Sequence, residues 1–206
     1  MDIRELAVPH AYEISPILRG DDRGVFLESY RADLLAEATG RAFLLRQGNI
    51  SVSKHGVARG IHYAEVNEPP TGQAKYFTVV VGSVVDFVVD IRVGSPTFGT
   101  WDSVELDDQN RKAVFLSEGL GHLFVVTSET VTVSYLTNDV YRPDREHGLS
   151  PLAADIGLDL PLPSSELILS AQDAAAPTLT AAREAGLLPT WDASLATYAA
   201  AAALGF

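Results

Sequence analysis

The sequence predicts a mainly β protein of the sandwich or barrel class, with short helices near its ends. Short runs of β-branched and aromatic residues recur between about Gln47 and Tyr141, and Gly, Pro, Asn and Asp separate these runs. Regularly spaced short strands are typical of antiparallel sandwiches and barrels. A chain of 206 residues is long enough for one such domain with additions.

The clearest predicted strands are residues 76–81 and 84–91, which are rich in valine and flank Gly82-Ser83. Two residues of this type between such runs are a β-hairpin signal, so we expect the two strands to pair with each other. Further strands are predicted, in chain order, at residues 104–106, 113–116, 123–126 and 131–135.

Helical signals occur at residues 31–39, around residues 180–184 and in the Ala-rich stretch 193–205. Residues 160–165, with two prolines and two serines, predict an extended connector before the last two helices. The residues after this connector lack a core of their own. We therefore expect one domain over residues 1–206, with a β-rich body to about residue 160 and a helical appendage from about residue 161.

Charge and composition exclude several classes of function. Fifteen Lys and Arg against 27 Asp and Glu give a net charge of −12, which argues against nucleic acid or an anionic membrane as the main partner. The sequence has no cysteine, so disulfides, iron–sulfur sites and thiol nucleophiles are excluded. Neither a signal peptide nor an apolar run of about 18 residues is evident, so we expect a soluble, cytoplasmic protein.

Two of the five histidines have an informative context. His62 ends a polar and apolar alternation over residues 59–63, as on a strand whose one face lines a cavity. His122 ends the Gly-rich turn 117–122 and leads into the apolar run 123–126. We expect both side chains to face one barrel interior. The remaining histidines, for which context indicates no role, are His10, His55 and His147.

A metal site is the alternative interpretation of these histidines. A Gly-rich turn with a trailing histidine, downstream of a strand with another, is the outline of a cupin barrel, and many cupins bind a metal. His62, Glu65 and His122 would be the ligands. A metal cupin typically has two histidines one residue apart on the first strand, whereas this chain has His62-Tyr63-Ala64.

Eight short motifs follow one another over about residues 10–190. They are DRGVFLE at 22–28, QGNIS at 47–51, RGIH at 59–62, QAK at 73–75, VDIR at 89–92 with GSPTFG at 94–99, GLGH at 119–122, Tyr135 with Tyr141, and SAQD at 170–173. With these motifs the sequence resembles the dTDP-4-dehydrorhamnose 3,5-epimerase family. The resemblance implies a cupin jelly-roll barrel that inverts carbons flanking the ketone of a dTDP-4-keto-6-deoxyhexose, without cofactor or metal.

The chemistry of such an inversion defines three roles. A carbon next to a ketone inverts by losing a proton on one face and gaining one on the other, which requires a base, an opposed acid and a group that holds the enolate oxygen. An imidazole with an ordinary pKa of about 6.5 is mostly neutral at pH 7, which suits His62 as the base. An ammonium suits the enolate oxygen, and Lys75 opens a predicted strand; a surface lysine is the alternative. The resemblance implies that Asp173 orients His62 and that Tyr135 is the acid, although a tyrosine there also suits a core or rim position.

The nucleotide requires other residues. Two phosphates call for guanidinium groups, and Arg23 and Arg59 match family positions that contact dTDP. Family members bind the base across a dimer interface, so the resemblance implies a homodimer. Phe26 is otherwise a strand core residue, and Asp86 and His122 are otherwise buried polar groups that fix the barrel. The substrate-binding residues that the resemblance implies are Arg23, Phe26, Glu28, Gln47, Asn49, Arg59, Asp86, His122 and Tyr141.

Three positions depart from the family pattern. Gln172 stands where a basic residue near the phosphates is common, Leu123 stands where glycine usually follows the histidine and adds bulk beside the sugar pocket, and Leu160 stands where double epimerases typically have tryptophan. These departures favour the branch that modifies deoxysugars of glycosylated natural products such as antibiotics. That branch often inverts only C3 or only C5, and the residues leave this choice open. A metal-dependent cupin oxygenase or isomerase, or a non-catalytic sugar-nucleotide binder, remains an alternative function.

Overall fold

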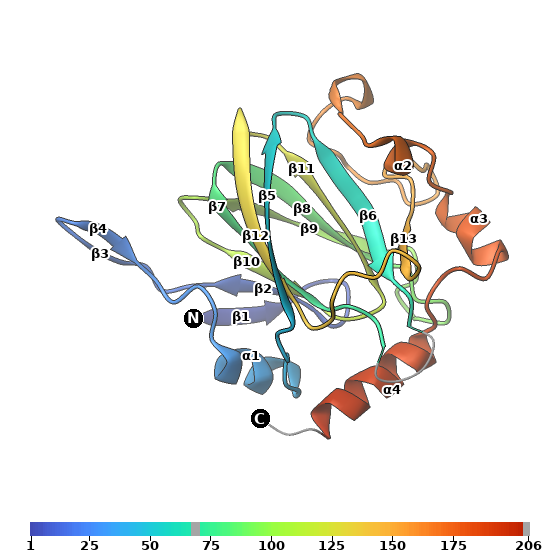
Figure 1. Ribbon diagram of the computed structural model, residues 1–206, viewed down its shortest axis with the longest axis horizontal. Helices are drawn as coiled ribbons and strands as arrows, with labels where there is room; N and C mark the ends of the chain where they lie inside the picture. Colours follow the sequence, from blue (N-terminus) through green and yellow to red (C-terminus); the bar gives the residue numbers. More distant parts are fainter. Residues whose placement is uncertain (67–70, 204–206) are drawn as a thin grey trace.

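Two antiparallel β-sheets face each other, and a separate β-hairpin projects from them (Figure 1). The computed structural model describes residues 1–66 and 71–203. In this part of the chain one sheet has the strand order β1-β2-β10-β7-β12-β5, the other has the order β13-β6-β11-β8-β9, and β3 pairs with β4 in the hairpin. The strands are β1 (Asp2–Glu5), β2 (Ala11–Ser15), β3 (Arg19–Asp21), β4 (Gly24–Phe26), β5 (Gln47–Lys54), β6 (Ala58–Ala64), β7 (Lys75–Val81), β8 (Ser83–Asp90), β9 (Trp101–Asp107), β10 (Ala113–Leu116), β11 (Leu120–Val126), β12 (Thr130–Thr137) and β13 (Glu146–Gly148).

The helices lie outside the two sheets (Figure 1). Helix α1 is capped at its C-terminus by Gly40, whose left-handed φ of 72° lets its N–H bond to the carbonyl of Ala36. Each of the other three helices begins after a serine or threonine whose hydroxyl accepts a backbone N–H of the first turn. The helices are α1 (Ala32–Thr39), α2 (Ala171–Ala174), α3 (Leu179–Glu184) and α4 (Trp191–Ala202), with a 3-10 turn η1 at Ser164–Glu166.

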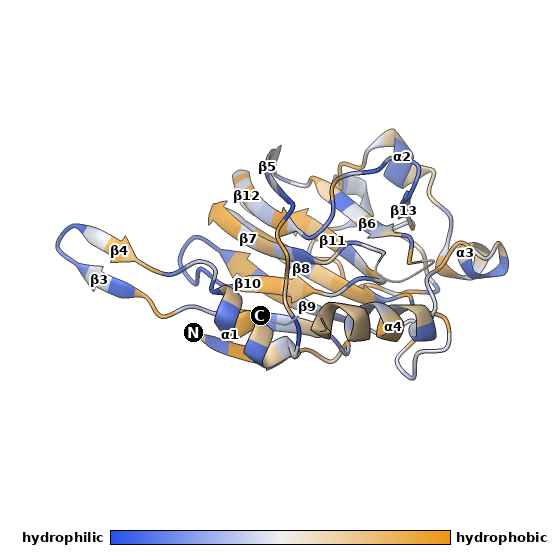
Figure 2. Cartoon of the chain, turned by 60° about the horizontal axis from the view of Figure 1, so that its bottom comes forward, coloured by the Kyte–Doolittle hydropathy of each residue, from blue (hydrophilic) through white to orange (hydrophobic). Residues whose placement is uncertain are grey.

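The alternation of side chains along each strand divides the hydrophobic residues between two layers. Figure 2 shows hydrophobic residues concentrated on the central strands of both sheets. On β11, Phe124 packs between the sheets, whereas Leu123 packs on the outer face of the five-stranded sheet. Residues of the 149–188 segment, including Leu149 and Leu179, cover that outer face. The C-terminal part of the chain therefore shares a core with the strands.

The mainly β prediction is confirmed, and so are the expected helices, which correspond to α1, α3 and α4. The strands expected between residues 47 and 141 also form, with slightly different ends. The sequence analysis missed β1 to β4 and β13, which lie outside that range. Of these, β1, β3, β4 and β13 have only three or four residues, too few for an alternation to stand out.

The predicted hairpin at Gly82-Ser83 is wrong. Strand β7 pairs with β10 and β12, whereas β8 pairs with β9 and β11, so the chain crosses from one sheet to the other at Gly82. Gly82 has a φ of 86°, and a Cβ there would overlap the carbonyl oxygen of Thr130. A glycine that connects two sheets has the same local signal as one in a hairpin, because both need a positive φ.

In the described ranges, none of the helices has the length and apolar character that a membrane crossing requires.

A buried ion pair joins the C-terminal helix to the five-stranded sheet. The Arg92 guanidinium donates to both carboxylate oxygens of Asp90 at 2.7 and 2.8 Å, and both side chains are inaccessible to solvent. The same guanidinium lies 4.5 Å from the ring centroid of Trp191 and donates to the hydroxyl of Tyr198, two residues of α4. Removing one member of such a pair leaves a buried charge without compensation.

We expect Arg92→Met to lower the free energy of unfolding by about 3–5 kcal/mol, because the Asp90 carboxylate would lose its counter-charge. Arg4→Met is the matched control, since the Arg4 side chain pairs with Glu13 but is 59% exposed, and it should cost less than about 1 kcal/mol. Urea unfolding of both variants measures the difference. Equal costs would show that burial does not determine the strength of the Arg92 pair.

Candidate active site

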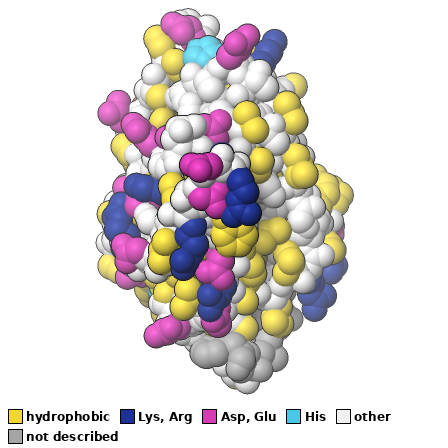
Figure 3. Space-filling model, turned by 90° about the vertical axis from the view of Figure 1, so that its left-hand side faces the viewer, with side chains coloured by type: hydrophobic (Ala, Val, Ile, Leu, Met, Phe, Trp, Pro, Cys, Tyr) yellow, Lys and Arg dark blue, Asp and Glu magenta, His cyan; other side chains and the backbone are white. Residues whose placement is uncertain are grey.

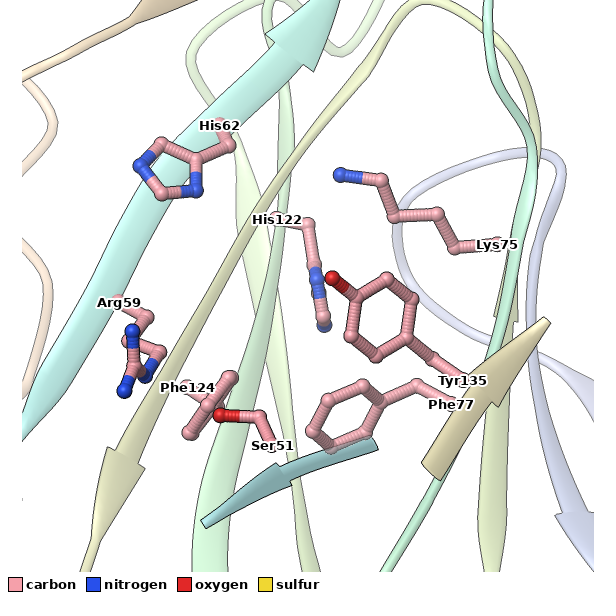
Figure 4. Close-up of a pocket in the computed structure, with 8 residues that line it drawn as sticks. All are labelled: Ser51, Arg59, His62, Lys75, Phe77, His122, Phe124 and Tyr135. Atoms are coloured by element: carbon pink, nitrogen blue, oxygen red, sulfur yellow. The ribbon is translucent and has the colours of Figure 1, made fainter. Parts of the chain in front are cut away.

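A cavity of about 160 Å³ lies between the two sheets (Figure 4). Its lining side chains come from both sheets and combine ionisable groups with aromatic rings. Figure 4 shows His62 on one side, with Lys75 and Tyr135 reaching in from the other. The lining residues are Ser51, Arg59, His62, Lys75, Phe77, His122, Phe124 and Tyr135.

A short hydrogen bond orients the His62 ring. Its Nε2 lies 2.7 Å from the carboxylate of Asp173, and Asp173 is buried. Burial alone would raise the pKa of Asp173, but the hydrogen bonds and charge of His62, together with Ser170, bring this pKa below its ordinary value. An ionised carboxylate accepts the Nε2 proton, which leaves the Nδ1 lone pair of His62 available as a base.

Helix α2 explains how a residue so distant in sequence reaches His62. Ser170 caps this helix, and its hydroxyl accepts the backbone N–H of Asp173 at 3.0 Å. The cap fixes the first turn, and this turn directs the Asp173 side chain toward strand β6.

Lys75 is the first residue of β7, and its side chain is buried in the cavity wall. Burial lowers the pKa of Lys75, while the negative charges of Glu146 and Asp86 act in the opposite direction. Among the residues that the structure describes, no carboxylate oxygen lies within 4.0 Å of its ammonium. The donors of the ammonium are therefore available to a ligand in the cavity.

A second histidine and carboxylate pair occupies the interior. His122 Nε2 lies 2.7 Å from Oδ2 of Asp86, and both residues are buried. Burial raises the pKa of Asp86, and His122 opposes this effect. The other carboxylate oxygen of Asp86 has no hydrogen-bond partner within residues 1–66 and 71–203. Asp86 therefore supplies negative charge to the interior without closing an ion pair with Lys75.

Tyr135 lies on β12, in the sheet opposite to the one that carries His62. Its ring stacks on Phe77 with centroids 6.1 Å apart. Burial, and then the charge of Glu146, raise the pKa of Tyr135 above its ordinary value. The phenol is thus protonated at neutral pH and suited to donate a proton.

Glu146 was not predicted as a site residue. Strand β13 pairs with β6 so that Gly148 opposes His62 and Glu146 opposes Ala64, which places Glu146 on the same face as His62. Burial raises the pKa of Glu146, while the charges of Lys75 and His62 lower it. Ser51, Phe77 and Phe124 were also missed. Each lies two residues after a predicted site residue on the same strand, so the period of a strand would have identified them.

The predicted nucleotide residues divide into two groups. Arg59 lines the cavity, and its Nε donates to the hydroxyl of Ser53 at 3.0 Å. On β5, the Gln47 side chain donates to Asn49 at 2.8 Å and accepts the backbone N–H of Tyr141 at 2.9 Å. Gln47, Asn49 and Tyr141 therefore lie together at one edge of the six-stranded sheet, whereas Arg59 lies on the other sheet.

Three predicted residues lie outside the cavity, on or just after the projecting hairpin (Figure 1). Arg23 pairs with Asp21, and Glu28 pairs with Arg31. Phe26 is 67% exposed, so the alternative of a core position for this ring is wrong. Within one chain the structure does not bring these three side chains to the cavity.

The expectation that Leu123 adds bulk beside the sugar pocket is wrong. Leu123 is fully buried in the core cluster on the outer face of the five-stranded sheet, whereas its neighbours His122 and Phe124 line the cavity. The strand period explains the error, since adjacent residues point to opposite faces.

The three candidate metal ligands do not converge. His62 pairs with Asp173, His122 pairs with Asp86, and Glu65 pairs with His147 at 2.7 Å. In the described part of the chain no three His, Asp or Glu side chains are grouped to hold a metal. The donor set therefore does not fit the metal-dependent alternative.

Comparisons with known proteins agree on one family. The family model described as dTDP-4-dehydrorhamnose 3,5-epimerase matches residues 5–181. A dTDP-4-dehydrorhamnose 3,5-epimerase of Mycolicibacterium smegmatis is 51% identical over 93% of this chain and 92% of its own length. A dTDP-4-dehydrorhamnose 3-epimerase of Streptomyces niveus is 49% identical over 93% of this chain and 90% of its own length. The crystal structure of ChmJ, a 3'-monoepimerase from Streptomyces bikiniensis in complex with dTDP-quinovose, superposes with a TM-score of 0.91, at 40% identity over 96% of this chain and 98% of that one.

The electrostatics of the cavity give a prediction about Lys75. Because the carboxylate of Glu146 stabilises the ammonium, Glu146→Gln should lower the pKa of Lys75 further below its ordinary value. The chain has only three lysines, Lys54, Lys75 and Lys112, so a ¹³C-NMR titration of the lysine ε-carbons resolves the change. Glu105→Gln, an exposed change on β9, should leave the pKa of Lys75 unaltered. An unchanged or raised pKa in the Glu146→Gln variant would contradict the assigned interaction.

Proposed function

The chain belongs to the dTDP-4-dehydrorhamnose 3,5-epimerase family and is an epimerase of dTDP-4-keto-6-deoxysugars, and we propose how its cavity performs the inversion. It shares the cupin fold of its structural relatives and acts in dTDP-deoxysugar biosynthesis. The observation that carries the proposal is that a histidine oriented by a carboxylate and a protonated tyrosine enter one cavity from opposite sheets, with a buried lysine beside them.

His62 removes the proton from the carbon next to the C4 ketone. Its Nδ1 lone pair takes the proton, and Asp173, bonded to Nε2, stabilises the imidazolium that forms. The electrons of the broken C–H bond move into the ketone and give an enolate at C4. The Lys75 ammonium holds this enolate oxygen, a type of interaction whose loss typically costs about 10²–10³ in rate.

Tyr135 returns a proton from the other side of the sugar. Since its strand belongs to the sheet that faces His62, a flat enolate between the two sheets presents one face to the base and the other to the phenol. Protonation by Tyr135 inverts the carbon, whereas return of the proton from His62 restores the original configuration. The same groups serve C3 and C5, since both carbons flank the ketone.

Arg59 holds the diphosphate in this proposal. Its guanidinium lines the cavity on the strand that carries His62, three residues before it. Gln47, Asn49 and Tyr141 lie together beside β5 and are proposed to hold the nucleoside. Asp86 and His122 are proposed to lie against the sugar and to keep the interior negative near Lys75.

We further propose a homodimer in which each chain completes the site of its partner. Arg23, Phe26 and Glu28 lie away from the cavity of their own chain, on or just after a hairpin with two large exposed apolar side chains, Val25 at 60% and Phe26 at 67% exposure. On the face with the hairpin, Figure 3 shows hydrophobic side chains interspersed with Arg, Lys, Asp and Glu. Strand β5 is the edge strand of the six-stranded sheet in the described residues, and it also exposes Ile50 and Val52.

Solvent exchange tests the acid and base roles. In D₂O, with a dTDP-4-keto-6-deoxyhexose as substrate, the enzyme should incorporate deuterium at C3, C5 or both, as followed by NMR. His62→Ala should abolish this exchange, because no other group takes the proton. Tyr135→Phe should reduce inversion more than exchange, because His62 can still remove and return a proton on one face.

The matched control is His55→Ala, which removes an exposed histidine whose ring bonds to the backbone carbonyl of Thr127, away from the cavity. It should exchange like the unaltered protein. Binding of dTDP without exchange at either carbon would identify a sugar-nucleotide binder instead, and equal losses of exchange and inversion in Tyr135→Phe would contradict the assigned acid.

The dimer gives a separate prediction. Phe26→Asp should shift the protein from dimer to monomer in analytical ultracentrifugation and weaken dTDP binding at least tenfold, because an exposed apolar ring and a binding surface are lost together. Leu152→Asp, at another exposed apolar side chain, should change neither property. A monomeric unaltered protein, or a dimeric Phe26→Asp variant with unchanged dTDP affinity, would refute the proposal.

A further inference from the structure

The position of Lys75 depends on its backbone more than on contacts of its ammonium. No carboxylate within ion-pair distance fixes that group in the residues the structure describes. The backbone of Lys75 itself is held by the six-stranded sheet, where it lies opposite Leu116 and Thr137. The residue before it, Ala74, precedes the strand and has no place in that ladder.

Asn138 supplies the missing partner of Ala74. Its Oδ1 accepts the backbone N–H of Ala74 at 2.8 Å, and its Nδ2 donates to Oε1 of Glu118 at 2.7 Å. The orientation of this amide is fixed by chemistry, because the backbone N–H can only donate and the carboxylate can only accept. The neighbouring Asp139 carbonyl accepts a longer bond, at 3.4 Å, from the side chain of Gln73.

Glu118 is fixed in turn by a buried ion pair. Arg41 donates to both of its carboxylate oxygens, at 3.1 and 2.6 Å, and both side chains are at most 5% exposed. The Arg41 guanidinium also lies 4.6 Å from the ring centroid of Tyr198 in α4. The Tyr198 hydroxyl donates to the backbone carbonyl of Glu118 at 2.6 Å. The C-terminal helix, which lies beyond the residues matched by the family model, thus holds this pair in place.

We propose that Asn138 is a positioning residue for Lys75. Asn138 holds the backbone N–H of Ala74 and thereby sets the register of Lys75 in the sheet. The buried Arg41–Glu118 pair, supported by helix α4, holds Asn138 in place. This inference rests on the proposed role of Lys75 at the enolate. A displacement of about 1 Å in a group that stabilises a developing charge is enough to cost about 10²-fold in rate. Asn138 itself makes no hydrogen bond to Arg59, Gln47 or Tyr141 in the described residues. The neighbouring Thr137 hydroxyl does bond to the backbone carbonyl of Gln47 at 3.4 Å, a contact that a change of the Asn138 side chain leaves in place.

The test is Asn138→Ala, which leaves the Ala74 N–H without its partner while Arg41 still compensates Glu118. We expect kcat for deuterium exchange to fall 10- to 100-fold, with KM and the Kd for dTDP unchanged within twofold. Asn110→Ala is the matched control, because Asn110 also bonds to backbone and carboxylate groups, in a turn away from the cavity. Its kcat should match that of the unaltered protein.

A double-mutant cycle separates positioning from general loosening. Asn138→Ala should change exchange less than threefold in a Lys75→Met background, since there is then no ammonium to position. An equal loss in both backgrounds, or a parallel change in dTDP affinity, would overturn the proposal. Should Asn138→Ala not fold, the near-isosteric Asn138→Leu replaces it, because it also removes the acceptor of the Ala74 N–H and predicts the same loss of kcat.

Failure of this inference is distinguishable from failure of the proposed mechanism. If Lys75→Met exchanges deuterium at the normal rate, the enolate role of Lys75 is wrong and the positioning role is wrong with it. If Lys75→Met loses exchange while Asn138→Ala retains it, only the positioning role is wrong.

Discussion

The burial of the Lys75 ammonium is the constraint on which the rest of the cavity depends. A charge in a low-dielectric interior is costly unless other charges or hydrogen bonds compensate it. In the described residues the compensation comes from Asp86 and Glu146, which act on the ammonium without reaching ion-pair distance. A direct carboxylate partner would stabilise Lys75 more, but it would also occupy the donors that the proposed mechanism assigns to the enolate oxygen. The arrangement thus sacrifices stability to keep the ammonium available.

The two sheets give the acid and the base their opposed positions. His62 and His122 lie on neighbouring strands of the five-stranded sheet, where each is paired with a buried carboxylate, whereas Lys75 and Tyr135 lie on neighbouring strands of the other sheet. A ligand between the sheets therefore meets imidazoles on one face, and an ammonium and a phenol on the other. If all four groups lay on one sheet, they would face the same side of the sugar. A group on that side could remove and return a proton, but inversion requires a proton donor on the opposite side.

The sequence motifs predicted part of the cavity lining. The side chains that were missed are those whose place in the cavity depends on which face of a strand points inward. The RGIH and GLGH motifs identified His62 and His122, and both line the cavity. Phe77 and Phe124 carry no motif, and only the strand period, counted from Lys75 and His122, places them in the cavity. The same limit explains Leu123, whose neighbours face the cavity while it faces the outer core. Glu146 was out of reach because its three-residue strand is defined by pairing with β6 rather than by any pattern of its own.

The sequence motifs leave open the choice between inversion at C3 and inversion at C5. Relatives of nearly equal identity to this chain are named as a double epimerase and as a C3 epimerase, so overall similarity does not decide the choice. In the proposed mechanism one base and one acid serve both carbons, and the sugar must turn about its link to the diphosphate to present the second carbon. Arg59 fixes the diphosphate end in that mechanism, so the freedom to turn depends on the walls beside the sugar, which include the rings of Phe77 and Phe124. We therefore expect regiochemistry to follow the shape of these apolar walls rather than the identity of the acid and base, because a wall that blocks rotation stops the second inversion without slowing the first.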